Sequence, residues 1–586
     1  MPSFRDLLTQ RLRAAFASAN IAVPDGIALD VVNASDARFG DYQSNAAMLV
    51  AKAAKMNPRQ LATTLVEHFE GAGLSQKPEI AGPGFLNFRL TPEVLGKTLA
   101  ATLSDPNCGV APAEHPRRIV VDFSAPNVAK PMHVGHIRST FIGDCLARIA
   151  RIAGHTVITD NHVGDWGTQF GMILHGWKTQ LNQEALHQDP IHELVRVYRA
   201  VNAATKADES VLEICKGELV RLQQGDAENL AIWKECVKLT LDQLHQIYDR
   251  LDIRFDHYLG ESFYNDQLAP LVTDMLTKGQ ALVSDGAACV FSDGSKKPEE
   301  DPFMVRDKEG EWRAAPCLIR KSDGAFLYAT TDLATIDYRV REWQADEIWY
   351  VVGAPQALHF RQVFEAAHRR GHATKMEHIA FGSILGPDGK MFKTRSGESV
   401  GLLEVIEESV ERAYAVVADR EGFSDDEKKS IAEIIGIAAV KYAELSQHRM
   451  TDYKFSWDKM LSLQGNTAPY LINAYVRTRG IFRKLESGFE IIGDIQLTEP
   501  DERALALKLS QFGEAVHDVL DLDFRPNLLA QYIYELAGFF HTFFESCPVL
   551  RSEGAVRDTR LALCEATSRV LKKGLELLGI RTTERM

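Results

Sequence analysis

The sequence has few of the features that mark metal-binding, secreted or membrane proteins. Its 586 residues include eight cysteines and no Cys-x-x-Cys pair, so neither a zinc knuckle nor a disulfide scaffold is indicated. No uninterrupted apolar run approaches the length that crosses a bilayer, and no membrane partner is expected. The sequence also contains no internal repeat and no low-complexity tract. Reduced thiols in the cytoplasm fit this cysteine usage best.

Basic residues are also fewer than acidic residues. The 66 basic and 80 acidic residues leave a net charge of −14, which argues against a strongly basic nucleic-acid-binding protein. Binding depends on local patches rather than on the total, and basic residues cluster after Ala468 and in the last 19 positions. Such clusters are usually solvated faces, so charge permits an acidic partner without requiring one.

The chain is too long for one hydrophobic core, so three or more domains are expected. Residues 1–112 read as mixed α/β and end in a linker rich in turn formers. From 117 to 400, strands alternate with helices, which is typical of a doubly wound parallel sheet. Two stretches in this part read as insertions, at about 190–251 and 285–325. Residues 401–586 are almost wholly helix-patterned and are expected to form a bundle.

The most informative segment is Ser124-Ala-Pro-Asn-Val-Ala-Lys-Pro-Met-His-Val-Gly-His136, which runs from a buried-strand pattern into a helix pattern. Free backbone N–H groups and the helix dipole favour anions at such a turn. His133 and His136 lie one turn apart and can both donate to phosphate oxygens, and Gly135 allows a nucleotide close to the backbone. The alternatives are a zinc-type pair or two surface histidines. No further ligands follow at metal spacing, so a nucleotide site is favoured.

A second segment, Phe381–Gly397, contains a Gly-rich loop with lysines at 390 and 393. Such a loop can close over a triphosphate, with an ammonium group neutralising the charge that grows on the leaving pyrophosphate. Alone, a loop of this kind is weak support, because most are solvated turns. Together with the two histidines about 250 residues earlier, it resembles the paired signatures of class I aminoacyl-tRNA synthetases.

Lys390-Met-Phe-Lys-Thr394 departs from that class's usual Lys-Met-Ser-Lys-Ser at its third and fifth positions. This departure is familiar in the arginyl-tRNA synthetases, where a lysine before the first signature is thought to share the phosphate role. Lys130 occupies that place. The resemblance implies that the catalytic residues are His133, His136, Lys130 and Lys393, and that ATP is bound by His133, Gly135, His136, Lys390 and Lys393.

The whole chain then resembles bacterial arginyl-tRNA synthetases. The matching segments are Phe39–Asn45, Gly82–Phe88, Asp160–Gly171, Gly260–Asn265, Leu327–Ala334 and Gly465–Leu471. The resemblance implies a Rossmann-like catalytic domain, an α/β N-terminal domain that binds the tRNA elbow, and an all-α anticodon-binding bundle. It also implies an arginine–tRNA ligase that activates L-arginine with ATP when tRNA is bound and transfers it to the 3′ end of tRNA(Arg). Mg²⁺ is expected with ATP, no zinc is expected, and the chain is expected to be a cytoplasmic monomer.

A guanidinium group keeps its charge and offers five donors in a plane, so its pocket needs carboxylates and other acceptors. By family resemblance, Asp332 and Tyr328 hold the guanidinium with Glu261 or Gln356 nearby, and Asn127 holds the α-amino end of arginine. Two alternatives remain open, since Glu261 could cap a helical turn and Asp332 could begin a helix after a strand-like Phe326–Thr330.

For tRNA, single-stranded bases are read by stacking and edge hydrogen bonds. Phe85 and Asn87 match the family's aromatic and amide pair for the elbow, and they share a face if the segment is a strand. The alternative is that Phe85 is core and Asn87 satisfies a turn. Tyr470, Phe544 and Met586 are expected near the anticodon.

Two competing interpretations can be tested against the sequence. A cysteinyl-tRNA synthetase would need a zinc-binding Cys/His set to select a thiol, and that set is missing. A non-catalytic tRNA-binding relative would have lost signature residues, but both histidines and both loop lysines are present.

Overall fold

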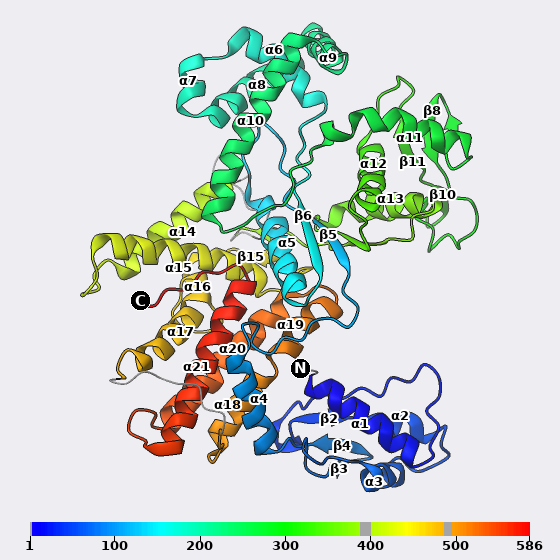
Figure 1. Cartoon of the computed structure of the whole chain (residues 1–586). Coiled ribbons are helices and arrows are strands. Elements are labelled where there is room, and N and C mark those ends of the chain that lie inside the picture. The colour runs from blue at the N-terminus through cyan, green and yellow to red at the C-terminus, as the bar shows by residue number, and fades with distance from the viewer. Residues whose placement is uncertain (1–2, 387–388, 390–399, 486–494) are drawn as a thin grey trace.

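The protein is described here by a computed structural model that covers residues 3–386, 389, 400–485 and 495–586. The chain forms a central parallel sheet, an N-terminal unit with an antiparallel sheet, and a helical C-terminal region (Figure 1). Figure 1 shows the N-terminal unit and the C-terminal helices side by side below the central sheet, with two further units projecting above it.

The central sheet consists of four parallel strands in the order β13-β12-β5-β6. Their bounds are Arg118–Asp122 for β5, Thr156–Asp160 for β6, Glu347–Tyr350 for β12 and Lys375–His378 for β13. Successive residues of a strand face opposite sides. Ile119 and Val121 pack in one cluster with helix α5 (Val134–Ile152), and Val120 packs in another with α12 (Tyr328–Arg341) and α13 (Ala357–Arg369). Helices therefore cover both faces, which confirms the doubly wound sheet expected from the sequence.

Two lateral units interrupt the alternation of strands and helices. The first is helical, with α6 (Thr168–Gln180), α7 (Gln183–Gln188), α8 (Pro190–Ala207), α9 (Glu209–Gln223) and α10 (Ala227–Arg250). The second contains η2 (Glu261–Tyr264), α11 (Asn265–Thr277), β7 (Leu282–Ser284), β8 (Ala287–Val290), β9 (Met304–Arg306), β10 (Trp312–Ala314) and β11 (Cys317–Arg320). The start of α8 follows from its sequence, because Asp189 accepts the N–H of His192 at 3.0 Å and Pro190 stands in the first turn.

The N-terminal unit places three helices against a small antiparallel sheet of order β1-β2-β4-β3. Its elements are α1 (Phe4–Ser18), β1 (Val32–Asn33), η1 (Ala37–Phe39), β2 (Tyr42–Ser44), α2 (Ala46–Ala51), α3 (Pro58–His68), β3 (Glu79–Ala81) and β4 (Phe85–Phe88). Helix α4 (Pro92–Ser104) then leads away to pack on the C-terminal helices α18 (Pro500–Ser510) and α21 (Gly554–Leu577). The buried carboxylate of Asp41 accepts two bonds from Arg503, at 3.0 and 2.6 Å, and so docks the unit on the C-terminal region.

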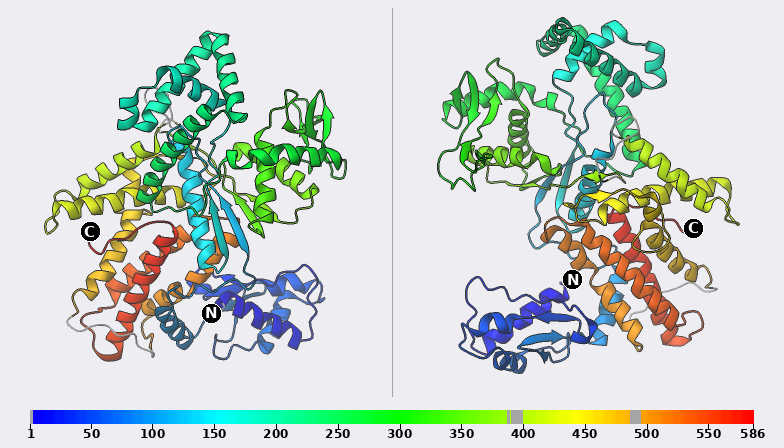
Figure 2. Two further views of the ribbon diagram at one scale, coloured as in Figure 1. Left: turned by 45° about the horizontal axis from the view of Figure 1, so that its top comes forward. Right: turned by 180° about the vertical axis from the view of Figure 1, so that it is seen from behind.

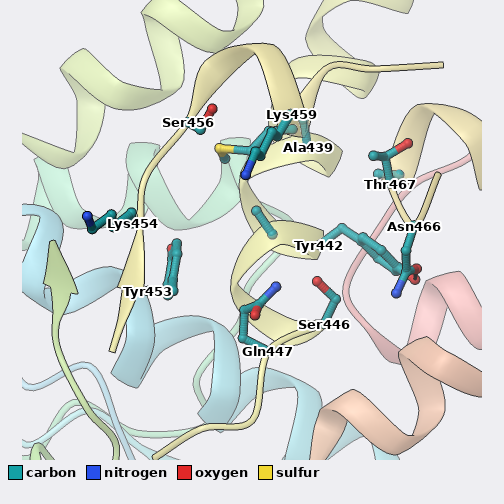
Figure 3. A pocket seen from close by; sticks show the side chains of 13 residues that line it. Ala439, Tyr442, Ser446, Gln447, Tyr453, Lys454, Ser456, Lys459, Asn466 and Thr467 are labelled. Atoms are coloured by element: carbon teal, nitrogen blue, oxygen red, sulfur yellow. Dashed lines mark hydrogen bonds between the residues drawn. The ribbon is translucent and has the colours of Figure 1, made fainter. Parts of the chain in front are cut away.

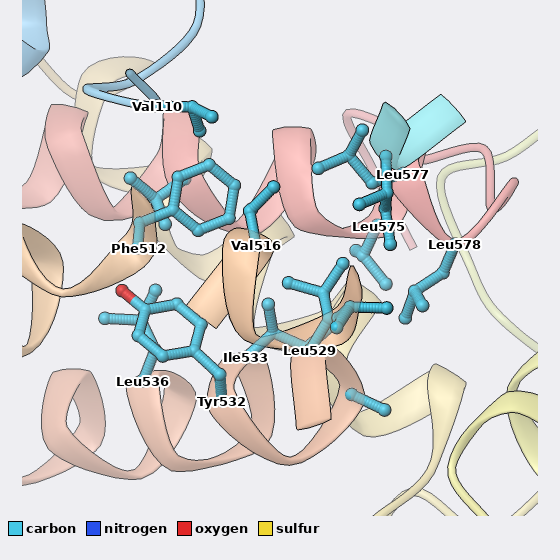
Figure 4. Close-up of a cluster of buried hydrophobic side chains, with 14 of the residues drawn as sticks. Val110, Phe512, Val516, Leu529, Tyr532, Ile533, Leu536, Leu575, Leu577 and Leu578 are labelled. Atoms are coloured by element: carbon cyan, nitrogen blue, oxygen red, sulfur yellow. The ribbon is translucent and has the colours of Figure 1, made fainter. Parts of the chain in front are cut away.

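The 3-10 helix η3 (Ala354–Gln356) lies between β12 and β13 in the chain, and the C-terminal region follows the central sheet. Its elements are β14 (Ile384–Leu385), α14 (Leu402–Val417), α15 (Asp425–Leu445), β15 (Tyr453–Lys454), α16 (Trp457–Met460), α17 (Ala468–Phe482), α18 (Pro500–Ser510), α19 (Phe512–Asp521), α20 (Pro526–Ser546) and α21 (Gly554–Leu577). Figure 2 shows these helices packed along one another from a second side. Phe512, Leu529 and Leu575, from three different helices, meet in one buried cluster (Figure 4). Burying each such side chain contributes about 1.5–3 kcal/mol.

One local expectation is wrong. The strand-like Phe326–Thr330 is the start of helix α12, which begins at Tyr328. Its aromatic and β-branched residues suggested a strand, but the Leu327 N–H donates to Thr330 Oγ1 at 3.4 Å and the following apolar residues pack into the core. Asp332 therefore lies inside the helix and does not begin it. Tyr328 and Asp332 are four residues apart on one helical face.

Candidate active site

Several polar side chains meet at the carboxyl ends of the four parallel strands. The chain passes from β5 to β6 on one side and from β12 to β13 on the other, so a crevice opens between β5 and β12. Below it, the fully buried guanidinium of Arg339 donates to Asp122 at 2.6 Å and Asp160 at 2.8 Å. This buried pairing holds the ends of β5 and β6 together at the floor of the crevice.

The two histidines of the first signature form the start of helix α5. His133 is its N-cap, and the ring centroids of His133 and His136 lie 4.1 Å apart. The Gly135 N–H donates to His133 Nδ1 and the His133 N–H donates to His136 Nδ1, each at 3.1 Å. We assign the proton of each neutral ring to Nε2, because Nδ1 is already an acceptor. Both rings can therefore donate from Nε2 to an anion at the helix terminus.

Burial keeps these rings neutral. It lowers the pKa of His133, with a further lowering from the Lys130 ammonium. Burial also lowers the pKa of His136 to about 4, and the neighbouring His133 adds to that effect. At neutral pH the two histidines are thus hydrogen-bond donors without a full charge, and the cation closest to them in the first signature is Lys130.

The segment that follows the second signature lies directly against the first. The Val134 N–H donates to the Val400 carbonyl at 2.8 Å, and the Leu402 N–H donates to the Met132 carbonyl at 2.9 Å. These bonds form a bridge between His133 and Gly401 across more than 250 residues of sequence. Lys390 and Lys393 lie outside the described residues. The structure nevertheless brings the residue after their loop into contact with the first signature.

The Lys130 side chain reaches the first helical insertion. Its ammonium group lies 5.3 Å from the centroid of the Tyr198 ring, which belongs to α8. Such a cation–π contact restricts the lysine without neutralising it. The sequence did not indicate a functional role for Tyr198, since an aromatic residue in a polar helix usually packs in the core.

Three carboxylates gather where the arginine site was expected. Burial raises the pKa of Glu261 to about 8, and the nearby charges of Asp165 and Asp332 add to the effect. Asp165 is fixed by Ser262, whose N–H and hydroxyl donate to it at 2.8 and 2.6 Å. Tyr328 stands beside this group and is 72% exposed. A bound cation would favour the ionised forms of these carboxyl groups.

His359 joins this group although the sequence did not single it out. Its Nε2 lies 2.5 Å from Asp332 Oδ2, and the hydrogen bond with Asp332 raises the pKa of the ring against the opposing effect of burial. The sequence could have indicated a role for His359, because it follows Gln356 by three residues and both belong to the turn and helix after β12. Gln356 itself is exposed at the end of η3.

Asn127 lies beside the acidic group, next to Gly164. Residues 127 and 164 form a parallel bridge, in which the Val128 N–H donates to the Gly164 carbonyl at 3.0 Å. A Cβ on Gly164 would lie 2.4 Å from Asn127 Oδ1. The absence of a side chain at 164 thus makes room for the amide of Asn127, one residue from the acidic group that Asp165 belongs to.

Comparison with known families identifies the family to which this protein belongs. The family model described as tRNA synthetases class I (R), catalytic domain, matches residues 98–457, which is more than half of the chain. The chain belongs to the arginyl-tRNA synthetases. The DALR anticodon binding domain matches residues 471–586, and the arginyl-tRNA synthetase N-terminal domain matches residues 4–90. The family and the class I fold expected from the two signatures are confirmed, and this synthetase is an enzyme.

Curated relatives and solved structures agree along the full length. The synthetase is 45% identical over 574 residues to the arginine–tRNA ligase of Pseudomonas fluorescens (strain Pf0-1), with 96% of each chain covered. It is 43% identical over 592 residues to that of Chromobacterium violaceum, with 100% of each chain covered. The crystal structure of arginyl-tRNA synthetase from Plasmodium falciparum aligns with a TM-score of 0.82 at 27% identity, covering 100% of both chains.

The residues expected to meet tRNA occupy different surroundings. Phe85 is partly buried, whereas Asn87 is 6% exposed and its Oδ1 accepts the Gln43 side-chain N–H at 2.8 Å. The Asn87 side chain thus hydrogen-bonds to a side chain on the neighbouring strand β2 rather than to a turn. Tyr470 is partly buried, with its hydroxyl 3.0 Å from His541 Nδ1, and Phe544 is 37% exposed on α20. Met586 packs against α14 and α15.

A pocket of about 490 Å³, partly open to solvent, lies between α15, β15, α16 and α17 (Figure 3). Lys454 and Lys459 are among the residues that line it, and the Tyr442 hydroxyl donates to Asn466 Oδ1 at 2.5 Å beside it. Strand β15 also pairs with β14, the strand that precedes the second signature. The pocket lining therefore includes β15, the neighbour of the strand before the second signature, and the start of α17, a helix of the C-terminal region.

None of the described helices is long and apolar enough to cross a membrane. Within the same residues, no group of three or more His, Cys, Asp or Glu side chains is arranged to hold a metal ion. All eight cysteines are free thiols in buried positions.

Proposed function

We propose that this arginine–tRNA ligase forms arginyl-adenylate at the carboxyl edge of its parallel sheet and then passes arginine to the 3′ end of tRNA(Arg). The observation that carries the proposal is the hydrogen-bonded bridge between His133 and Gly401, and the same β5–α5 loop holds Asn127, which bridges to Gly164 beside Asp165 of the acidic group. A phosphate-binding helix start and a guanidinium-binding pocket then lie on the two sides of one crevice.

ATP is held by the start of α5 and by the lysines of both signatures. His133 and His136 donate from Nε2 to phosphate oxygens, and Gly135 lets the nucleotide approach the backbone. Lys130, Lys390 and Lys393 supply the positive charge that the neutral histidines lack. Their charge stabilises the pyrophosphate as it leaves.

Arginine is held by the acidic pocket on the other side. Asp332 and Glu261 accept from the guanidinium group, and the hydroxyl of Tyr328 and the amide of Gln356 complete its surroundings. Asn127 holds the α-amino end and turns the carboxylate of arginine toward ATP. A guanidinium is always charged, so it is the side chain that best offsets three neighbouring carboxylates.

The reaction needs no nucleophile from the protein. A carboxylate oxygen of arginine attacks the α-phosphorus of ATP, a new P–O bond forms, and the bond to pyrophosphate breaks. A terminal adenosine hydroxyl of tRNA then attacks the carbonyl of the mixed anhydride, and AMP leaves. The synthetase contributes by positioning the reactants and by stabilising developing charge.

The other two regions hold tRNA. We assign residues 1–112 to the elbow, with Phe85 and Asn87 at the contact, and residues 401–586 to the anticodon, with Tyr470, Phe544 and Met586 near it. Residues 117–400 form the catalytic domain in this assignment. The contact of β15 with both the catalytic loop strand and the bundle supports a route by which bound tRNA promotes the first step.

Three further assignments accompany this function. Mg²⁺ arrives with ATP and is held by its phosphates. The eight buried free thiols support a cytoplasmic location. The active unit is a monomer, because one chain carries the catalytic and both tRNA-binding regions; light scattering after gel filtration tests this.

Pyrophosphate exchange into ATP tests the function directly. Exchange should require both L-arginine and tRNA(Arg), and it should fail with citrulline, which has the same shape without the charge. Exchange supported by citrulline as well as by arginine would contradict the acidic pocket as the site of selection. Exchange supported by cysteine and not by arginine would overturn the function itself.

A further inference from the structure

The loop between β5 and α5 holds three residues in a strained backbone conformation. Ser124, Ala125 and Ala129 have φ angles of 74°, 45° and 57°. This left-handed region is unfavourable for residues other than glycine, because the Cβ crowds the following carbonyl. Such residues persist only where the surroundings hold them, and they gather at functional sites.

Each strained residue donates its backbone N–H to a side chain from a different element. Ser124 donates to Ser139 Oγ on α5 at 2.8 Å, Ala125 donates to Asn161 Oδ1 after β6 at 3.0 Å, and Ala129 donates to Thr240 Oγ1 on α10 at 3.2 Å. Ser139, Asn161 and Thr240 are 7%, 0% and 2% exposed. A buried N–H that loses its acceptor is costly, so these bonds oppose relaxation of the loop.

The three acceptors are themselves oriented. Ser139 donates its hydroxyl hydrogen to the Val351 carbonyl at 2.7 Å, and Thr240 donates its own to the Cys236 carbonyl at 2.8 Å. Asn161 donates its amide to the Tyr248 hydroxyl at 3.0 Å. With both hydroxyl hydrogens and one amide hydrogen committed elsewhere, each side-chain oxygen accepts from the loop. The three side chains therefore favour one backbone conformation of the loop.

The loop presents the residues that face the crevice. Asn127, which is exposed, stands between the strained positions, and Lys130, which is partly buried, follows the last of them, whereas Val128 and Ala129 are fully buried. A change of φ at 129 would therefore move Lys130 relative to the histidines of α5. Two of the supporting side chains, Thr240 and Tyr248, come from the insertion helix α10, whose contribution to the reaction was not evident from the sequence.

We infer that Ser139, Asn161 and Thr240 are positioning residues for catalysis, which hold the loop 124–130 in its strained form so that Asn127 and Lys130 meet arginine and ATP in the productive geometry. The inference rests on the proposed roles of Asn127 and Lys130. It assigns a catalytic purpose to the helical insertion, which supplies one of the three acceptors.

The test uses a double-mutant cycle on the full-length enzyme with tRNA present. Thr240→Val keeps the size and shape of the side chain and removes the acceptor. It should lower kcat for pyrophosphate exchange about 10- to 100-fold, because small displacements of reacting groups are costly. Thr240→Ser keeps the hydroxyl and should restore most of kcat. In an Ala129→Gly background, where a left-handed φ carries no penalty, Thr240→Val should lower kcat by only about threefold or less.

Thr567→Val is the matched control, since Thr567 is also a buried helical threonine that donates to a carbonyl four residues back, at 2.7 Å, but on α21. A kcat loss of equal size in that variant would overturn the inference, as would a Thr240→Val loss that is the same in both backgrounds. The variants Lys130→Ala and Asn127→Ala distinguish failure of the proposed site roles from failure of the positioning inference. If both stay fully active, the proposed site roles fail; if they are impaired and Thr240→Val is not, the positioning inference alone fails.

Discussion

Arg138 and Glu444 form a buried ion pair that joins the first-signature helix to the helix α15 of the C-terminal region. Their Nε and Oε1 atoms are 2.6 Å apart, and both side chains are at most 1% exposed. Arg138 also donates to the Thr451 carbonyl at 3.0 Å and lies over the rings of Phe381 and Tyr453. One guanidinium thus contacts the segment before β14, the segment before β15 and β15 itself.

Glu444→Gln should lower the free energy of unfolding by about 3–5 kcal/mol, because it leaves the Arg138 charge buried without its counter-charge. Chemical denaturation followed by circular dichroism measures the change. The double variant Arg138→Met, Glu444→Leu should recover much of the loss, since apolar replacement of a buried pair is often neutral. A double variant less stable than Glu444→Gln would contradict this account.

Arginine binding should release a proton near pH 7. The pKa of Glu261 is raised from its ordinary 4.5 to about 8 in the empty pocket, so the carboxyl is protonated at pH 7. A bound guanidinium favours the carboxylate, so the proton leaves on binding and arginine affinity should rise as pH increases toward 8. Above pH 8 the release should fade, because the group is already ionised. Titration calorimetry in buffers of different ionisation enthalpy counts the protons, and Glu261→Gln should remove this contribution.

Asp332→Ala should abolish arginine activation while ATP affinity changes little, since it removes a carboxylate that faces the expected guanidinium. We expect a loss of about 3–5 kcal/mol in arginine binding, measured through KM for arginine and ATP in pyrophosphate exchange. His359→Asn, which frees Asp332 from its 2.5 Å contact, should raise KM for arginine less than Asp332→Ala does. A KM for arginine within a few-fold of the parent in Asp332→Ala would disprove the assignment.

Gly164→Ala should impair arginine use while the fold is kept. The added Cβ would lie 2.4 Å from Asn127 Oδ1, so the amide must move away from the place where it meets the substrate. We expect kcat/KM for arginine to fall about 10-fold or more, with KM for ATP less affected. Gly217→Ala is the control, because nothing lies within 4 Å of a Cβ at that position. Equal activity of the two variants would argue against a role for Asn127.

Asn87→Ala should raise KM for tRNA and leave KM for arginine and ATP nearly unchanged. A lost base contact costs about 1–3 kcal/mol in tRNA binding. The low exposure of Asn87 and its bond to Gln43 offer another explanation, in which the change disturbs the sheet. The variant Gln43→Ala removes the same hydrogen bond by deleting its other partner, and it therefore distinguishes a lost base contact from a disturbed sheet. If both variants weaken tRNA binding equally, Asn87 acts through the strand and not through a base.

The fold and the two signatures could be predicted because they leave local patterns. The run Ile119–Phe123 has the composition of a buried parallel strand, and the histidine spacing matches one helical turn. The start of α12 could not be predicted, because aromatic and β-branched residues at Phe326–Thr330 fit a strand until tertiary packing decides otherwise. Tyr198, His359 and Thr240 were missed for a related reason. Their partners are 27 to more than 100 residues away, and pairing at that range has no local signature.

The burial of all eight cysteines has a practical consequence for measuring motion in this enzyme. Burial raises the pKa of the thiols at positions 108, 236 and 317, so native thiolate is scarce as well as inaccessible. Maleimide dyes react with exposed thiolates and should leave the folded parent unlabelled. Cysteines introduced at two exposed sites can then carry a fluorophore pair without first removing the native ones. The distance between the N-terminal unit and the C-terminal helices thereby becomes measurable in the unaltered scaffold as tRNA is added.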